Sequence, residues 1–153
     1  LASVKVPGRM EMVWHSPRVI VDGAHNTDSL KCLIKAVGAN VPYDSMVMIF
    51  GCAADKDIDG MLAEVALGAD KVVFTRASGS GRAADPRDLA RRFSDDHGKM
   101  AQVSENIAEA FALATRAVNR EDLLLVTGSF YLVGEAKKHL AGVAAKRGVA
   151  VPQ

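Results

Sequence analysis

Short runs of apolar residues constrain the fold of this 153-residue chain more than any other feature of its sequence. The four clearest read VIV (19–21), MVMIF (46–50), VVF (72–74) and LLLV (123–126). A strand with one face in solvent alternates polar and apolar residues, whereas a strand covered on both faces is apolar throughout. Runs this short favour strands over helices. We therefore predict a sheet that is buried between two layers of helices.

Segments with a helical pattern of apolar residues lie between these runs. We expect helices over residues 27–37, 58–67, 87–93, 104–118 and 130–146. Asn26 or Thr27 is a suitable cap for the first, Asp85 followed by Pro86 for the third, and Ser104 for the fourth. Two weaker strands are expected over 10–14 and 100–103, and the first should pair with 18–21 as a short N-terminal β-hairpin. This alternation predicts an α/β fold, with a Rossmann-like, mostly parallel sheet and helices on both faces.

The composition is that of one globular domain, with 49% hydrophobic and 24% charged residues. The net charge is only +1, from 19 basic and 18 acidic residues, so the sequence gives no reason to expect nucleic-acid or membrane binding. Cys32 and Cys52 have apolar neighbours and no metal-like spacing. We expect both to be buried thiols of a cytoplasmic protein.

Side chains that can bind or react follow several of the predicted strands. They include Asp22 and His25, Lys56, Arg76 and Arg82, and Thr127 with Ser129. The carboxyl ends of parallel strands meet at one edge of a sheet, where helix N-termini favour anions. Each residue also has a simpler interpretation: Asp22 as an acceptor for backbone N–H groups, His25 as a loop residue, Lys56 as a solvated lysine and Ser129 as a helix cap. Their shared location favours a binding site.

Two known sequence motifs for nucleotide binding bear on the function of this edge. The chain contains no G-x-x-x-x-G-K-[ST] sequence and therefore no P-loop. Residues 79–84 read G-S-G-R-A-A, but the expected helix begins after this motif and not within it, which argues against a dinucleotide-binding fingerprint.

Five motifs, in order, identify a family. PGRMEMV (7–13), VIVDGAHN (19–26), FGCAADKD (50–57), RAADPRDLA (82–90) and VTGSFYLVGE (126–135) span nearly the whole chain. Together they resemble the C-terminal domain of folylpolyglutamate synthase/dihydrofolate synthase, which belongs to the Mur-ligase superfamily. The resemblance implies an ATP- and Mg²⁺-dependent ligase that converts a carboxylate of dihydropteroate or a folate into an acyl phosphate. The amine of L-glutamate then displaces phosphate.

The resemblance also implies roles for five residues. Arg9 and Asp22 match positions that contact ATP, and His25 and Ser129 match positions that hold the incoming glutamate. Lys56 matches a lysine that meets a carboxylate of the amino acid, so His25 and Lys56 are the candidate catalytic residues. No metal ligand is assigned to this chain. We expect the strands before His25 and Ser129 to be neighbours, with the strand before Lys56 between or beside them.

The chain begins Leu1-Ala2-Ser3 without a Met. We expect residues 1–153 to be a glutamate-ligase domain that follows a P-loop ATPase domain, which would hold most of the ATP and Mg²⁺. Such an enzyme would serve folate biosynthesis and one-carbon metabolism in the cytoplasm, as a monomer, and the isolated domain should be inactive. Two alternatives stay open: the C-terminal domain of a peptidoglycan-precursor Mur ligase, and a stand-alone α/β module that binds a phosphorylated ligand.

Overall fold

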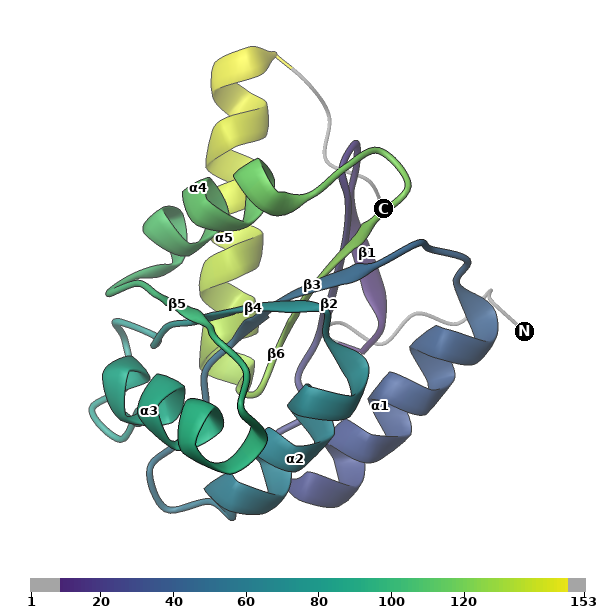
Figure 1. The fold of residues 1–153 in the computed structure, drawn as a ribbon. Coiled ribbons are helices and arrows are strands. Elements are labelled where there is room, and N and C mark those ends of the chain that lie inside the picture. Colours follow the sequence, from purple (N-terminus) through teal and green to yellow (C-terminus); the bar gives the residue numbers. More distant parts are fainter. Residues whose placement is uncertain (1–8, 149–153) are drawn as a thin grey trace.

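The computed structural model describes residues 9–148, which form one six-stranded sheet with five helices (Figure 1). The elements are β1 (Glu11–His15), β2 (Arg18–Asp22), α1 (Thr27–Asn40), β3 (Met46–Phe50), α2 (Ile58–Gly68), β4 (Lys71–Phe74), α3 (Pro86–His97), β5 (Gln102–Val103), α4 (Ile107–Ala117), β6 (Leu123–Thr127) and α5 (Phe130–Arg147). Pro7 and Gly8, in the first of the five motifs, lie outside the described residues. Within residues 9–148, no helix is long and apolar enough to cross a membrane.

The strands lie in the order β1-β2-β6-β3-β4-β5. β1 runs antiparallel to β2 and the other neighbours are parallel, which confirms the predicted α/β fold and its N-terminal hairpin. Thr127, at the end of β6, pairs with Asp22 of β2 on one side and with Phe50 of β3 on the other. β2 and β6 are therefore neighbours, as expected, and β3 lies on the other side of β6.

Helices cover both faces of the sheet (Figure 1). On one face, α1, α2 and α3 bury residues such as Leu30, Leu62 and Phe93 against alternate strand residues. On the other face, α4 and α5 bury Phe111 and Leu132 in a second core. All five residues of β3 are buried because successive side chains enter opposite cores. The double covering explains why the central strands are apolar without alternation.

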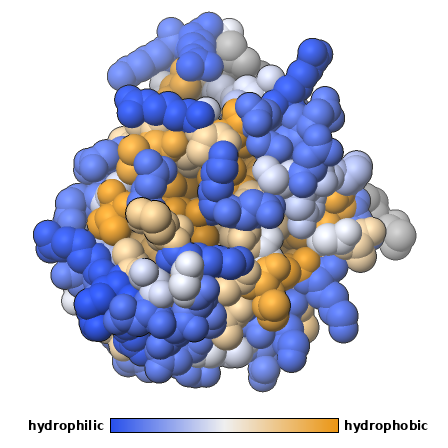
Figure 2. Space-filling view, viewed as in Figure 1, coloured by the Kyte–Doolittle hydropathy of each residue, from blue (hydrophilic) through white to orange (hydrophobic). Residues whose placement is uncertain are grey.

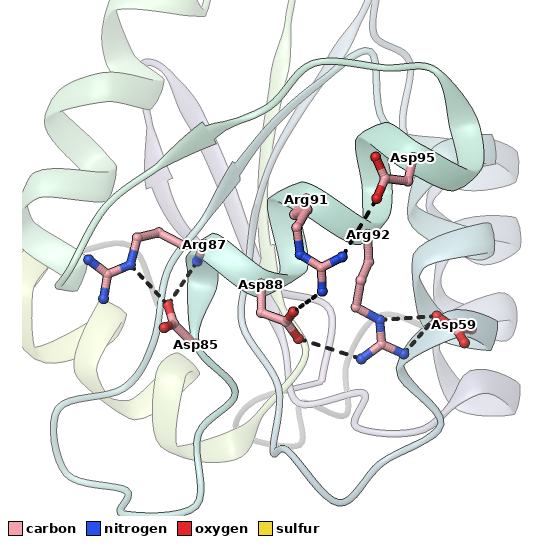
Figure 3. A network of polar contacts seen from close by, with 7 residues as sticks. All are labelled: Asp59, Asp85, Arg87, Asp88, Arg91, Arg92 and Asp95. Atoms are coloured by element: carbon pink, nitrogen blue, oxygen red, sulfur yellow. Dashed lines mark hydrogen bonds and ion pairs between the residues drawn. The ribbon is translucent and has the colours of Figure 1, made fainter.

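The outer surface of α3 is strongly hydrophilic (Figure 2, lower left). Arg92 bonds Asp59 of α2 through two nitrogens, at 3.2 and 2.7 Å, and thereby joins the two helices. Arg91 lies 2.5 Å from Asp88 in the same network (Figure 3). These ion pairs are exposed and contribute little to stability individually, so their main effect is to fix the side chains that link α2 and α3.

Two sequence predictions are wrong. Ser104 does not cap α4: its side chain is buried, with Oγ 2.8 Å from the Asn106 carbonyl oxygen and 2.9 Å from Thr75 Oγ1. Asn106 is the cap, and its side chain accepts a hydrogen bond from the Glu109 N–H at 2.9 Å. Cys32 is exposed, because it lies on the outer face of α1, whereas Cys52 is buried as expected.

Candidate functional site

A cavity of about 320 Å³ opens at the carboxyl edge of the sheet. Four connections contribute to its lining: the β2–α1 turn, the β3–α2 loop, the β4–α3 loop and the β6–α5 turn with the start of α5. The residues that line it include three of the predicted site residues, His25, Lys56 and Ser129. We call this cavity the edge pocket.

The backbone and a neighbouring ring fix the imidazole of His25 at the edge pocket. Its Nδ1 lies 3.1 Å from the carbonyl oxygen of Gly23. Because a carbonyl can only accept, Nδ1 must carry the proton, which leaves Nε2 of the neutral ring as an acceptor. The ring also packs against Phe130, with centroids 5.5 Å apart. A Cβ at Gly23 would lie 2.2 Å from the Phe130 ring, so a larger residue there would have to displace the ring.

Ser129 caps helix α5 and borders the same pocket. Its Oγ accepts hydrogen bonds from the Tyr131 and Leu132 N–H groups, at 3.1 and 3.3 Å. A hydroxyl that accepts two bonds still has one O–H to donate, so the capping role leaves a donor for a ligand. The preceding Gly128 has φ +113°, and a Cβ there would lie 2.2 Å from the carbonyl oxygen of Gly51. Only glycine fits this turn.

Lys56 places a positive charge at the edge pocket. It belongs to the β3–α2 loop, where its backbone bonds Ala53 O at 3.3 Å and the Ile58 N–H at 2.8 Å. Its side chain is exposed, and its ammonium group forms no hydrogen bond or ion pair with any residue between 9 and 148. A lysine without a partner at a pocket wall can pair with an anionic ligand.

Arg9 and Asp22 lie together, outside the lining of the edge pocket. Asp22 is only 7% exposed, and its two oxygens accept hydrogen bonds from the Met10 and Ala24 N–H groups, at 2.9 and 2.8 Å. The bond to Met10 fixes the chain next to the exposed Arg9. The simpler interpretation of Asp22, as an acceptor for backbone groups, is therefore present, yet each carboxylate oxygen keeps a second lone pair for another donor.

Several pocket residues were not predicted as site residues. Asp55 and Arg82 form an ion pair between the two long loops, and Phe130 and Tyr131 add exposed aromatic rings at the pocket. The hydrogen bond from Arg82, with its positive charge, lowers the pKa of Asp55, so this carboxylate is ionised. Arg82 follows β4 and is among the side chains expected at this edge, but no role was predicted for it. Phe130 and Tyr131 follow Ser129, and nothing in their sequence pattern indicates that they belong to a site.

Neither sulfur nor metal chemistry is indicated by this pocket. Burial raises the pKa of the Cys52 thiol to about 12, so Cys52 stays a neutral wall residue. Within the described part of the chain, no group of three or more His, Cys, Asp or Glu residues could hold a metal ion. The described residues therefore form no preformed all-protein metal centre.

Comparisons with known proteins show the family to which this chain belongs. The family described as "Mur ligase, glutamate ligase domain" matches residues 8–130. A probable bifunctional folylpolyglutamate synthase/dihydropteroate synthase of Halobacterium salinarum is 34% identical over 137 residues, which cover 90% of this chain and 16% of that protein. A dihydrofolate synthase/folylpolyglutamate synthase of Mycobacterium tuberculosis is also 34% identical, over 77% of this chain and 24% of its own length.

A solved structure shows the same fold. Folylpolyglutamate synthase of Mycobacterium tuberculosis, crystallised with ADP and AMPPCP, superimposes with a TM-score of 0.84 and 30% sequence identity. The match covers 91% of this chain and 33% of that enzyme, so the chain spans about a third or less of each of these proteins. By sequence and by fold, the chain belongs to the family of Mur ligase glutamate ligase domains.

Proposed function

We propose that this chain is the amino-acid-binding domain of an ATP-dependent ligase that joins L-glutamate to dihydropteroate or a folate through an acyl phosphate. One observation carries the proposal: His25, Lys56 and Ser129, from three connections of the sheet, line one pocket. The names of the relatives support the folate class of substrate. A monomeric, cytoplasmic enzyme of folate and one-carbon metabolism is the corresponding cellular role.

The pocket offers complementary groups to each part of glutamate. The Lys56 ammonium can pair with a carboxylate, and the Ser129 hydroxyl can donate a hydrogen bond to a carboxylate oxygen. Nε2 of His25 can accept a hydrogen bond from the amino group of glutamate. This bond would orient the lone pair of the amine nitrogen toward the acyl carbon. In the reaction, the amine nitrogen bonds the acyl carbon, the carbon–oxygen bond to phosphate breaks, inorganic phosphate leaves, and the nitrogen gives up its protons to His25 Nε2 and to solvent. We assign catalytic roles to His25 and Lys56 on this basis.

The nucleotide would lie next to Arg9 and Asp22, on the side of the turn at residues 22–26 (DGAHN) that faces away from the edge pocket. Arg9 is exposed and can pair with phosphate oxygens, while the free lone pairs of Asp22 can accept from a hydroxyl or amino group of ATP. The sequence contains no P-loop, and residues 9–148 contain no group of three or more His, Cys, Asp or Glu residues that could hold a metal ion. A preceding domain of the full-length protein would therefore hold most of the ATP and the Mg²⁺, and it is the partner that this domain requires.

Such a two-domain arrangement would act mainly by positioning. Holding an amine and an acyl phosphate in a reactive orientation can lower a barrier by roughly 7–11 kcal/mol. A domain that binds only the amine cannot obtain this gain alone. We therefore expect the isolated 153-residue chain to release no phosphate from ATP and to ligate no glutamate. Steady turnover by rigorously purified chain would contradict the two-domain proposal.

The test of the proposed function is an amino-acid screen with the full-length protein. Phosphate release is measured with ATP, Mg²⁺ and either dihydropteroate, a folate or a peptidoglycan precursor as the acid. Release that requires L-glutamate together with one of the pterin substrates is expected. Release that requires a peptidoglycan precursor and another amino acid would favour the other class of Mur ligase. Nucleotide binding by the isolated chain, without turnover in any combination, would favour a stand-alone binding module.

A further inference from the structure

Helix α5 holds one wall of the edge pocket by a carboxylate that does not itself line it. Glu135, in the second turn of α5, accepts hydrogen bonds from two consecutive backbone N–H groups of the β4–α3 loop. Its Oε1 lies 3.1 Å from the Ser78 nitrogen, and its Oε2 lies 2.9 Å from the Gly79 nitrogen. Both oxygens of one side chain are therefore used to fix a loop that lies 56 residues earlier in the chain.

The other end of this loop is fixed differently. Ala83 pairs with Ala53 in an isolated antiparallel bridge, flanked by bonds from Ala54 N to Arg82 O at 2.7 Å and from Ala84 N to Cys52 O at 2.8 Å. These backbone bonds tie the end of the loop to the β3–α2 connection, which carries Lys56. The loop is thus anchored at two places.

Residues 79–82 lie between the two anchors and line the edge pocket. Their remaining backbone N–H bonds are long: the Ser80 N–H reaches Ala77 O at 3.4 Å, and the Arg82 N–H reaches Ser80 Oγ at 3.3 Å. The side chain of Arg82 also pairs with Asp55, at the second anchor. Among residues 9–148, Glu135 is the only side chain outside the loop that is hydrogen-bonded to the backbone of 77–82. Removal of its carboxylate would free the first half of this wall.

We propose that Glu135 is a positioning residue for the amino-acid pocket, acting through the loop and not by contact with the substrate. This inference rests on the proposed function. The same helix then sets two parts of the pocket, since its N-cap, Ser129, also lines the pocket, and Glu135 fixes the loop. Ser78, Gly79 and Arg82 are exposed, so release of the loop uncovers no core and should cost little stability. The expected consequence is a loss of affinity for the amino acid.

The test compares Glu135→Ala and Glu135→Gln with Glu109→Gln in the full-length enzyme. Glu109 is an exposed acid in the first turn of α4, away from the pocket lining, and serves as the matched control. Glu135→Ala should raise KM for glutamate by about tenfold or more, which corresponds to about 1.4 kcal/mol per tenfold. KM for ATP should change by less than about twofold, since ATP would not use this wall. Glu135→Gln keeps one acceptor and should lie between wild type and Glu135→Ala.

Amide hydrogen exchange supplies a second measurement that does not depend on turnover. The amides of Ser78 and Gly79 should exchange faster in Glu135→Ala than in wild type or Glu109→Gln. If those amides exchange faster while KM for glutamate stays at its wild-type value, the loop does not shape the pocket and the inference is wrong. An equal rise in both KM values together with a fall in Tm would reduce Glu135 to a structural residue, which also overturns it.

Failure of the proposed function would look different. If the wild-type enzyme does not use glutamate but uses another amino acid, the proposed substrate is wrong. KM for that amino acid is then compared with KM for ATP in each variant. A selective rise in its KM would still support Glu135 as a positioning residue, and no selective rise would refute it.

Discussion

Ser129 has two roles that suitable substitutions can separate. As the cap of α5 it accepts hydrogen bonds from Tyr131 and Leu132, and as a proposed glutamate ligand it donates one. Ser129→Ala removes both functions. Loss of the cap should cost about 1 kcal/mol, within a range of about 0.5–2. For a chain of this size, this cost lowers Tm by about 2–4 °C.

Ser129→Asp keeps the cap and removes the donor. An aspartate caps as well as a serine, and its charge suits a helix N-terminus, so the Tm of the 153-residue chain should equal or exceed that of wild type. The carboxylate, however, would face a carboxylate of glutamate. Loss of one hydrogen bond to a charged group is worth about 1.5–3 kcal/mol, or about 10- to 150-fold in kcat/KM for glutamate, and repulsion adds to it.

The assay pairs melting curves of the chain with glutamate and ATP kinetics of the full-length enzyme. The expected pattern is that Ser129→Ala loses both stability and glutamate affinity, while Ser129→Asp loses only the affinity, and to a greater extent. If Ser129→Asp uses glutamate as well as wild type does, the hydroxyl is only a cap, and the assignment of Ser129 to the amino acid is refuted.

Three further predictions concern other residues. Lys56→Ala should raise KM for glutamate by about 10-fold or more with little effect on KM for ATP, because the unpaired ammonium of Lys56 lies at the pocket. Equal effects on both KM values would contradict this prediction. Arg9→Ala and Asp22→Ala should instead lower kcat/KM for ATP by about 10- to 150-fold, and unchanged ATP kinetics in both folded variants would exclude them from the nucleotide site. In native protein at pH 8, a thiol reagent should label the exposed Cys32 and leave Cys52 unmodified, because Cys52 is buried and has a pKa of about 12. Labelling of both cysteines without denaturant would contradict the packing of the pocket wall.

Much of the fold follows from local sequence because the sheet is covered on both faces. β3 begins and ends where its apolar run does, since every residue of the run enters one of the two cores. The outer position of Cys32 was also within reach of the sequence, because it does not share the face formed by Leu30, Leu33 and Val37. Its apolar neighbours outweighed the helical spacing in the prediction.

The cap of α4 shows where local rules are insufficient. Ser104 and Asn106 are both good capping residues and lie two positions apart. The hydrogen bond between Ser104 and Thr75, across neighbouring strand ends, places the serine in the interior and leaves Asn106 to begin the helix. A contact between residues so distant in sequence has no local signature.

The same reason limits prediction of the site. His25, Lys56 and Ser129 follow strand ends, so topology alone brings them to one edge of the sheet. Glu135 lies inside a helix and acts on a loop from another connection, so nothing in its neighbours indicates the contact.

A structure of the full-length enzyme with L-glutamate, a folate and a non-hydrolysable ATP analogue tests the central claim most directly. We expect glutamate to occupy the edge pocket, with a carboxylate within hydrogen-bond distance of Ser129 Oγ and Lys56 Nζ, and with its amino nitrogen near His25 Nε2. The ATP analogue should meet Arg9 on the other side of the turn at residues 22–26. Glutamate bound elsewhere, with the edge pocket filled by nucleotide or by solvent alone, would refute the proposed function.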